Sequence, residues 1–190
     1  MITTWLVASG LGAGDCETIR SGFLAQPGNA VSSLAYVMAG ALLLHLRRRL
    51  PETGRITAVG GLLVAVGAGS FLYHGPSPAG TQLVHDATIA ALLGFLAWWS
   101  APAVMSPWWW VVAGGVVAAA LVISPAISGP VLASIGALSA AAVVVRLGRV
   151  PALRRRIAAL VLVATVAAAA FVFGATGGPW CSPDSLVQAH

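Results

Sequence analysis

The chain alternates long apolar runs with short polar or arginine-rich segments. Each run holds about 16–20 residues, close to the roughly 20 that a helix needs to cross the hydrocarbon core of a membrane. Helices are expected because lipid offers no partner for unpaired backbone groups and the runs show no alternating barrel pattern. Six runs are predicted as transmembrane helices: Ala30–Leu46, Ile56–Tyr73, Leu83–Trp99, Trp108–Ile123, Ala126–Val145 and Ile157–Phe173.

The fold class predicted from this pattern is an all-α, polytopic membrane helix bundle forming one membrane-embedded domain over residues 1–190. Residues 1–29 form a segment before the bundle, residues 30–173 the six helices, and residues 174–190 a tail. Composition agrees, because 58% of the residues are hydrophobic and 8% charged, against roughly 25% charged in soluble domains. Mean hydropathy is +0.91.

Arginine placement predicts the orientation of the bundle. Nine of the ten basic residues lie between runs one and two or between runs five and six, and all ten are arginines. Six crossings put both loops on one side, which the positive-inside tendency assigns to the cytoplasm. The net charge of +5 is therefore a topology signal rather than a sign of nucleic-acid binding. The N-terminal segment, the loop at residues 75–82 and the tail are expected to face outward.

A few polar side chains gather at the predicted outer ends of the helices. Ser70 and His74 lie four residues apart near the end of run two, which places them on one helix face. Asp86 opens run three after a short Gly/Pro-rich turn, and His190 lies in the outward tail. Zinc binds such nitrogen and oxygen ligands, and a catalytic zinc keeps one position open for water. Asp86 could also simply cap a helix start, and Ser70 could be a small packing residue.

Two further predictions concern single side chains on the outer side. His85 points about 100° away from Asp86 on an ideal helix, which favours a place at the lipid interface over one beside the site. Cys16 and Cys181 are separated by an even number of crossings, so both face outward, where disulfides persist. We predict that they are bonded to one another; two free thiols are the alternative.

The polar pattern resembles that of a known family. The run Ser70-Phe71-Leu72-Tyr73-His74, then Asp86, then Cys181-Ser182-Pro183 leading to His190, is similar to the alkaline ceramidase branch of the CREST superfamily. The early Asp15-Cys16-Glu17 and the stretch Gln26-Pro27-Gly28-Asn29-Ala30-Val31-Ser32-Ser33-Leu34 add to the likeness. Members of that family are seven-helix membrane proteins, and most are regarded as zinc-dependent lipid amidases or hydrolases.

This resemblance implies a role for each matching residue. His74 and His190 would be zinc ligands, Asp86 would orient or deprotonate the attacking water, and Ser70 would stabilise the oxyanion. The expected substrate is a membrane lipid amide, most closely a ceramide. Calcium is a possible second cofactor, with Asp15 and Glu17 as ligands, although Gln26 stands where another acid is expected and weakens this case.

The chain also departs from the family pattern. The family closes its metal site with H-x3-H at the start of a seventh helix, and His190 matches only the first of those histidines. We therefore expect a seventh helix to belong to the complete protein, and weak zinc binding without it.

Two other function classes stay open: a non-catalytic membrane receptor or sensor, and a small transporter in which Asp86 and the histidines relay protons. Arginine-only basic usage and abundant Ala, Gly and Val are typical of a GC-rich bacterial genome, which predicts a bacterial plasma membrane protein.

Overall fold

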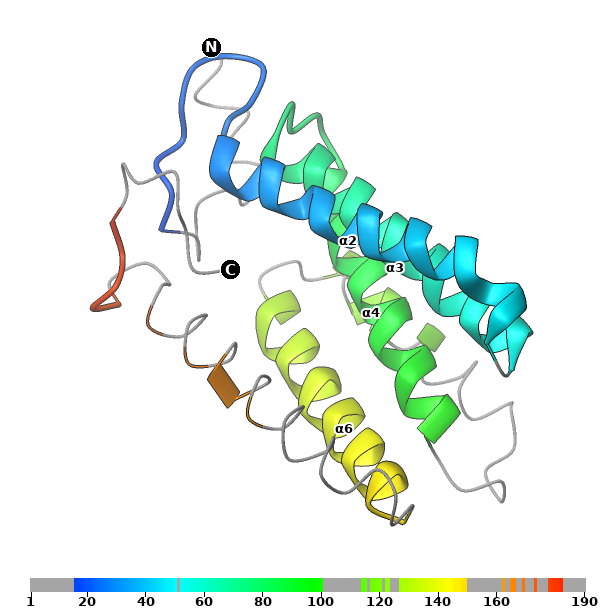
Figure 1. Ribbon diagram of the computed structural model, residues 1–190. Helices are drawn as coiled ribbons and strands as arrows, with labels where there is room; N and C mark the ends of the chain where they lie inside the picture. Colours follow the sequence, from blue (N-terminus) through cyan, green and yellow to red (C-terminus); the bar gives the residue numbers. More distant parts are fainter. Residues whose placement is uncertain are drawn as a thin grey trace. The chain divides into compact units, whose positions relative to one another are not determined.

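The computed structural model describes residues 16–50, 52–100, 114–115, 117–120, 122–123, 127–149, 162, 165–166, 169, 173 and 178–182. Its long elements are the α-helices α2 (Pro27–Leu46), α3 (Thr53–His74), α4 (Thr81–Ser100) and α6 (Ser128–Gly148), with a 3-10 turn η1 (Arg47–Arg49) after α2 (Figure 1). No strand occurs among these described residues. The all-helical prediction is therefore confirmed.

Four of the six predicted membrane spans correspond to these long helices. Pro27–Arg49, Thr53–His74, Thr81–Ser100 and Gly129–Gly148 are each long and apolar enough to cross a membrane. Helix α2 begins three residues before the apolar run because Pro27, at the first helical position, has a backbone suited to starting a helix. Half of the fourth run, Trp108–Ile123, and most of the sixth, Ile157–Phe173, lie outside the described residues, and both runs stay predictions.

The chain divides into two compact units, Met1–His85 with Val163–His190, and Asp86–Leu162. In the first unit α2 and α3 lie side by side and antiparallel (Figure 1). Small residues let the two backbones approach closely. A Cβ built on Gly40 would lie 2.5 Å from the carbonyl oxygen of Gly60, and one on Gly67 would lie 2.8 Å from that of Ser33. Close approach at small residues is how helices associate inside lipid, where no hydrophobic force drives them together.

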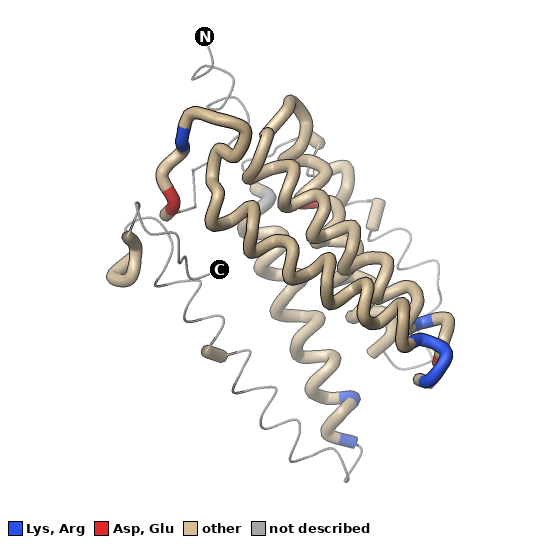
Figure 2. The backbone as a smooth tube through the Cα atoms, turned by 45° about the horizontal axis from the view of Figure 1, so that its top comes forward, with Lys and Arg blue, Asp and Glu red and all other residues tan. Residues whose placement is uncertain are grey.

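The ends of this helix pair differ in character. Four of the five arginines of the first unit gather at the turn between α2 and α3 (Figure 2). Arg48 and Arg49 are exposed there, and Arg55 pairs with Glu52 at 2.7 Å. At the opposite end of α2 and α3 the chain buries polar side chains. The side chains that face away from the pair are apolar and exposed, including Val31, Met38 and Leu42 on α2, as expected for a surface in contact with lipid.

Candidate functional site

The buried polar end of the first unit centres on His74, the last residue of α3. His74 is 4% exposed, and Ser70, one helical turn earlier, is 8% exposed. Both side chains therefore lie on the same buried face, as the four-residue spacing predicts. Polar groups buried within a membrane-spanning element need partners, and the structure provides them from the chain segment that precedes α2.

That segment is joined to the end of α3 by backbone and side-chain hydrogen bonds. The backbone N–H groups of Ala25 and Gln26 donate to the carbonyl oxygens of Gly75 (2.9 Å) and His74 (2.8 Å). The side-chain Oε1 of Gln26 lies 2.7 Å from Nδ1 of His74. Gln26 also donates from Nε2 to the carbonyl oxygen of Glu17 at 3.0 Å. His74 is thus held through both its backbone and its ring.

Glu17 occupies the start of helix α2. One oxygen of its carboxylate accepts from the backbone N–H of Gly28 and the other from that of Asn29, each at 2.8 Å. These are orphan N–H groups of a first helical turn, which attract negative charge. Glu17 is only 2% exposed. Its role in the structure is to cap α2, and the prediction that it binds calcium stays a prediction.

A second polar contact joins α2 to α3 below the histidine. The hydroxyl oxygens of Ser33 and Ser70 are 2.8 Å apart, and Ser33 Oγ also lies 2.7 Å from the carbonyl oxygen of Asn29. A hydroxyl has one hydrogen to donate. When Ser33 gives its hydrogen to Ser70, the Ser70 hydrogen stays available for another acceptor; when Ser33 gives it to Asn29, Ser70 must donate to Ser33.

Two aromatic side chains pack against the His74 ring. Tyr73 lies 4.8 Å from His74 between ring centroids, and His85 lies 5.0 Å from Tyr73 and 5.6 Å from His74. The preference for a lipid-interface position of His85 is therefore wrong. On an ideal helix His85 points about 100° away from Asp86, but that angle does not determine which residues of another helix His85 contacts.

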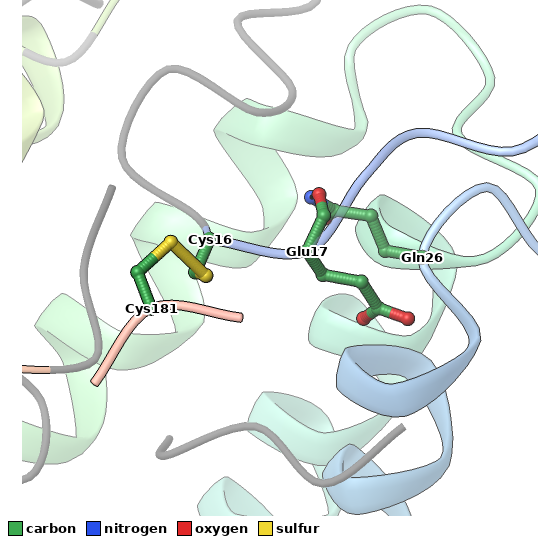
Figure 3. Close-up of a disulfide and its surroundings, with 4 residues drawn as sticks. All are labelled: Cys16, Glu17, Gln26 and Cys181. Atoms are coloured by element: carbon green, nitrogen blue, oxygen red, sulfur yellow. Dashed lines mark hydrogen bonds between the residues drawn. A yellow bond between two sulfur atoms is a disulfide. The ribbon is translucent and has the colours of Figure 1, made fainter. Parts of the chain in front are cut away.

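The predicted disulfide is present and lies directly before Glu17. Cys16 and Cys181 are bonded, with their Cα atoms 5.4 Å apart and 165 residues between them in sequence. Figure 3 shows the bond beside the Glu17 and Gln26 side chains, which lie next to one another. The disulfide ties the tail to the segment that holds His74, and the prediction is confirmed.

The remaining predicted site residues lie in the second unit or outside the described residues. Asp86 is buried, at 6% exposed, on α4, where it begins the second unit. His190 and Asp15 lie outside the described residues, so their zinc and calcium assignments stay predictions. Within the described residues no group of three His, Cys, Asp or Glu side chains could hold a metal ion.

Sequence reasoning missed three buried polar side chains of α2 and the segment before it: Gln26, which contacts His74, and Asn29 and Ser33. These residues could have been recognised as polar positions at helical spacing at the start of an apolar run, because a polar group buried in a membrane helix needs a hydrogen-bonding partner. Asn29 is 1% exposed, and its Oδ1 has no hydrogen-bond partner in the part of the chain that the structure describes.

Comparison with known proteins adds no assignment: no family model, curated protein or solved structure matches the chain.

Proposed function

We propose that this protein is a zinc-dependent integral membrane hydrolase that cleaves a lipid amide bond, with a ceramide-like lipid as substrate. The observation that carries the proposal is the fixed, buried ring of His74, whose Nδ1 contacts Gln26 at 2.7 Å. Zinc-ligating histidines almost always bond their second ring nitrogen in this way, which orients the metal-binding nitrogen. The residues around His74 therefore fit a metal ligand.

In this proposal His74 and His190 would hold the zinc. A bound zinc would supply Lewis acidity and lower the pKa of a coordinated water toward 7. Asp86 would accept a proton from the attacking water and return it to the amine nitrogen as the C–N bond breaks, which leaves a fatty acid and a free amine. Ser70 donates a hydrogen bond to the oxyanion that forms when water attacks the amide carbonyl.

The membrane setting supports a lipid as substrate. Four helices are long and apolar enough to cross a bilayer, and the buried polar cluster lies at the end of α2 and α3 opposite to the arginine-rich turn. A site at that depth can receive an amide near the headgroup boundary of a lipid. We place the site on the outer face of a bacterial plasma membrane, in a bundle of six helices.

Metal content and turnover test the proposal together. The purified protein, supplied with zinc, is expected to bind one zinc per chain. His74→Ala is expected to lose that zinc, whereas His45→Ala, an exposed histidine at the arginine-rich end of α2, is expected to keep it. Asp86→Asn is expected to keep zinc while kcat on a fluorescent ceramide analogue falls roughly 10²–10⁴-fold.

Each alternative predicts a different result. A receptor or sensor would bind the lipid without turnover in any variant. A proton-relaying transporter would move protons across the membrane without hydrolysing the lipid, and Asp86→Asn would abolish that proton movement. Hydrolysis of the analogue that survives Asp86→Asn would reject the role given to this carboxylate.

A further inference from the structure

Gln26 is a completely buried glutamine whose side chain uses both of its polar atoms. Its exposed fraction is 0%, and a buried amide without partners is costly, at about 1–3 kcal/mol for each group left unsatisfied. Its Nε2 donates to the carbonyl oxygen of Glu17 and its Oε1 contacts Nδ1 of His74. Gln26 therefore links the segment that caps α2 to the imidazole at the end of α3.

The contact with Glu17 determines which way the Gln26 amide faces. A backbone carbonyl oxygen can only accept, so the group that meets it must be the NH2 of the amide. A flipped amide would set two acceptor oxygens against each other. The Gln26 oxygen is therefore the atom that faces the histidine.

The same logic extends to the ring. The amide oxygen of Gln26 can only accept, so Nδ1 of His74 must carry a hydrogen. A neutral imidazole protonated at Nδ1 keeps its lone pair on Nε2. The carbonyl oxygen of Glu17, 57 residues before His74, thus fixes the orientation of the Gln26 amide, and that amide fixes the tautomer of His74.

The surrounding contacts leave Gln26 little freedom to turn away. Its own backbone N–H is bonded to the carbonyl oxygen of His74, and that of the preceding Ala25 to Gly75. Glu17 is held by its two bonds to the first turn of α2 and follows Cys16 of the disulfide. The backbone of Gln26 and the side chain of Glu17 are therefore held in place by separate contacts.

We propose that Gln26 is a positioning residue that keeps Nδ1 of His74 protonated, so that Nε2 is the electron-pair donor offered to a divalent transition metal. The protonation of Nδ1 depends only on the contacts above, whereas the metal-binding consequence rests on the proposed function. Outer partners of ligating histidines typically account for 10–100-fold in metal affinity.

Nitrogen NMR of the imidazole side chains tests the protonation directly. The chain has four histidines, so ¹⁵N-histidine labelling with single His→Gln variants assigns His74. At pH about 8, where an ordinary imidazole is neutral, Nδ1 of His74 is expected to be protonated in the unsubstituted protein with or without zinc. An unprotonated Nδ1 would overturn the proposal without any Gln26 variant.

Two substitutions separate positioning from general stability. Gln26→Glu, as a carboxylic acid whose O–H donates to the Glu17 carbonyl oxygen in place of Nε2, keeps an acceptor for Nδ1 and is expected to keep it protonated. Gln26→Met keeps the length but removes the acceptor and shifts the proton toward Nε2. Zinc affinity is expected to fall roughly 10–100-fold in Gln26→Met and to recover in Gln26→Glu. Gln82→Met, at a partly buried glutamine in the first turn of α4, is the matched control and is expected to change neither quantity.

The outcomes distinguish this proposal from the function on which its second half rests. If Nδ1 responds to Gln26 as stated but zinc leaves the His74 resonances unchanged, the positioning role stands and the zinc hydrolase fails. If Gln26→Met leaves Nδ1 fully protonated, the positioning role fails whatever zinc does.

Discussion

Ser139 on α6 donates a hydrogen bond to the carbonyl oxygen of Leu93 on α4 at 2.7 Å. About two turns further along both helices, the Arg146 guanidinium donates to the carbonyl oxygen of Trp99. The guanidinium also lies over the Trp99 ring, 5.9 Å from its centroid. Leu93 pairs with Ser139, and the later Trp99 pairs with the later Arg146. The residue numbers therefore increase in the same direction along both helices, so α4 and α6 run parallel within the second unit. A parallel pair of spans requires an odd number of crossings between them, which supports the predicted fourth span, Trp108–Ile123.

Cysteine labelling tests this topology. Both native cysteines are in the disulfide, so an introduced cysteine is the only free thiol. A membrane-impermeant maleimide applied to intact cells is expected to label Ala79→Cys, in the turn before α4, and to leave Arg48→Cys and Arg149→Cys unlabelled until the membrane is opened. All three positions are exposed in the structure. Labelling of Arg149→Cys together with Ala79→Cys would contradict two parallel crossings by α4 and α6.

The Cys16–Cys181 bond is expected to contribute strongly to stability. It closes a loop over 165 residues, for which the chain-entropy treatment gives about 5 kcal/mol. That figure is an upper limit here, because the helices of a membrane protein stay inserted when their tertiary contacts are lost. Reductant is expected to lower the Tm of the protein in detergent, and the double variant Cys16→Ala with Cys181→Ala is expected to melt at this lower Tm with or without reductant. An unchanged Tm on reduction would contradict a structural role.

Glu17→Gln is expected to destabilise the protein by about 1–3 kcal/mol, because the amide offers one acceptor where two N–H groups of α2, one buried and one partly buried, need partners. The matched control is Glu52→Gln. Glu52 pairs with Arg55 on a surface where both side chains are 43% exposed, so its loss is expected to cost less than about 1 kcal/mol. Chemical unfolding in micelles measures both, and equal costs would argue against the capping role.

The same pair of variants tests calcium. If Glu17 is a calcium ligand, added calcium raises the Tm of the unsubstituted protein and of Glu52→Gln but not of Glu17→Gln. A capping role alone predicts no calcium dependence in any of the three.

The sequence predicts the parts of this protein that depend on one segment at a time. Apolar run length located α2, α3, α4 and α6, and the parity of crossings paired the two cysteines. The site is harder because its contacts join segments far apart in the chain. Gln26 and His74 are 48 residues apart, and their pairing depends on how the segment before α2 meets the end of α3. His85 was misplaced for the same reason, since Tyr73 and His74 reach it from another helix.

The contact between Ser33 and Ser70 yields a prediction about how the oxyanion is stabilised. If Ser70 donates to the oxyanion, its hydrogen must be available, which requires Ser33 to donate to Ser70 rather than to the carbonyl oxygen of Asn29. Ser70→Ala is expected to lower kcat by roughly 10²–10³-fold with zinc content unchanged. Ser33→Ala is expected to lower kcat less, because it removes only the group that orients Ser70.

Combining the substitutions shows whether Ser33 acts through Ser70. The double variant is expected to be no slower than Ser70→Ala alone, since residues that act as a unit give non-additive effects. Ser32→Ala is the control, because the hydroxyl of Ser32 bonds the same Asn29 carbonyl at 3.0 Å but lies on the exposed face of α2; its kcat is expected to equal that of the unsubstituted protein. If the losses from Ser33→Ala and Ser70→Ala instead multiply, the two hydroxyls contribute independently, and Ser33 must touch the substrate or the water itself.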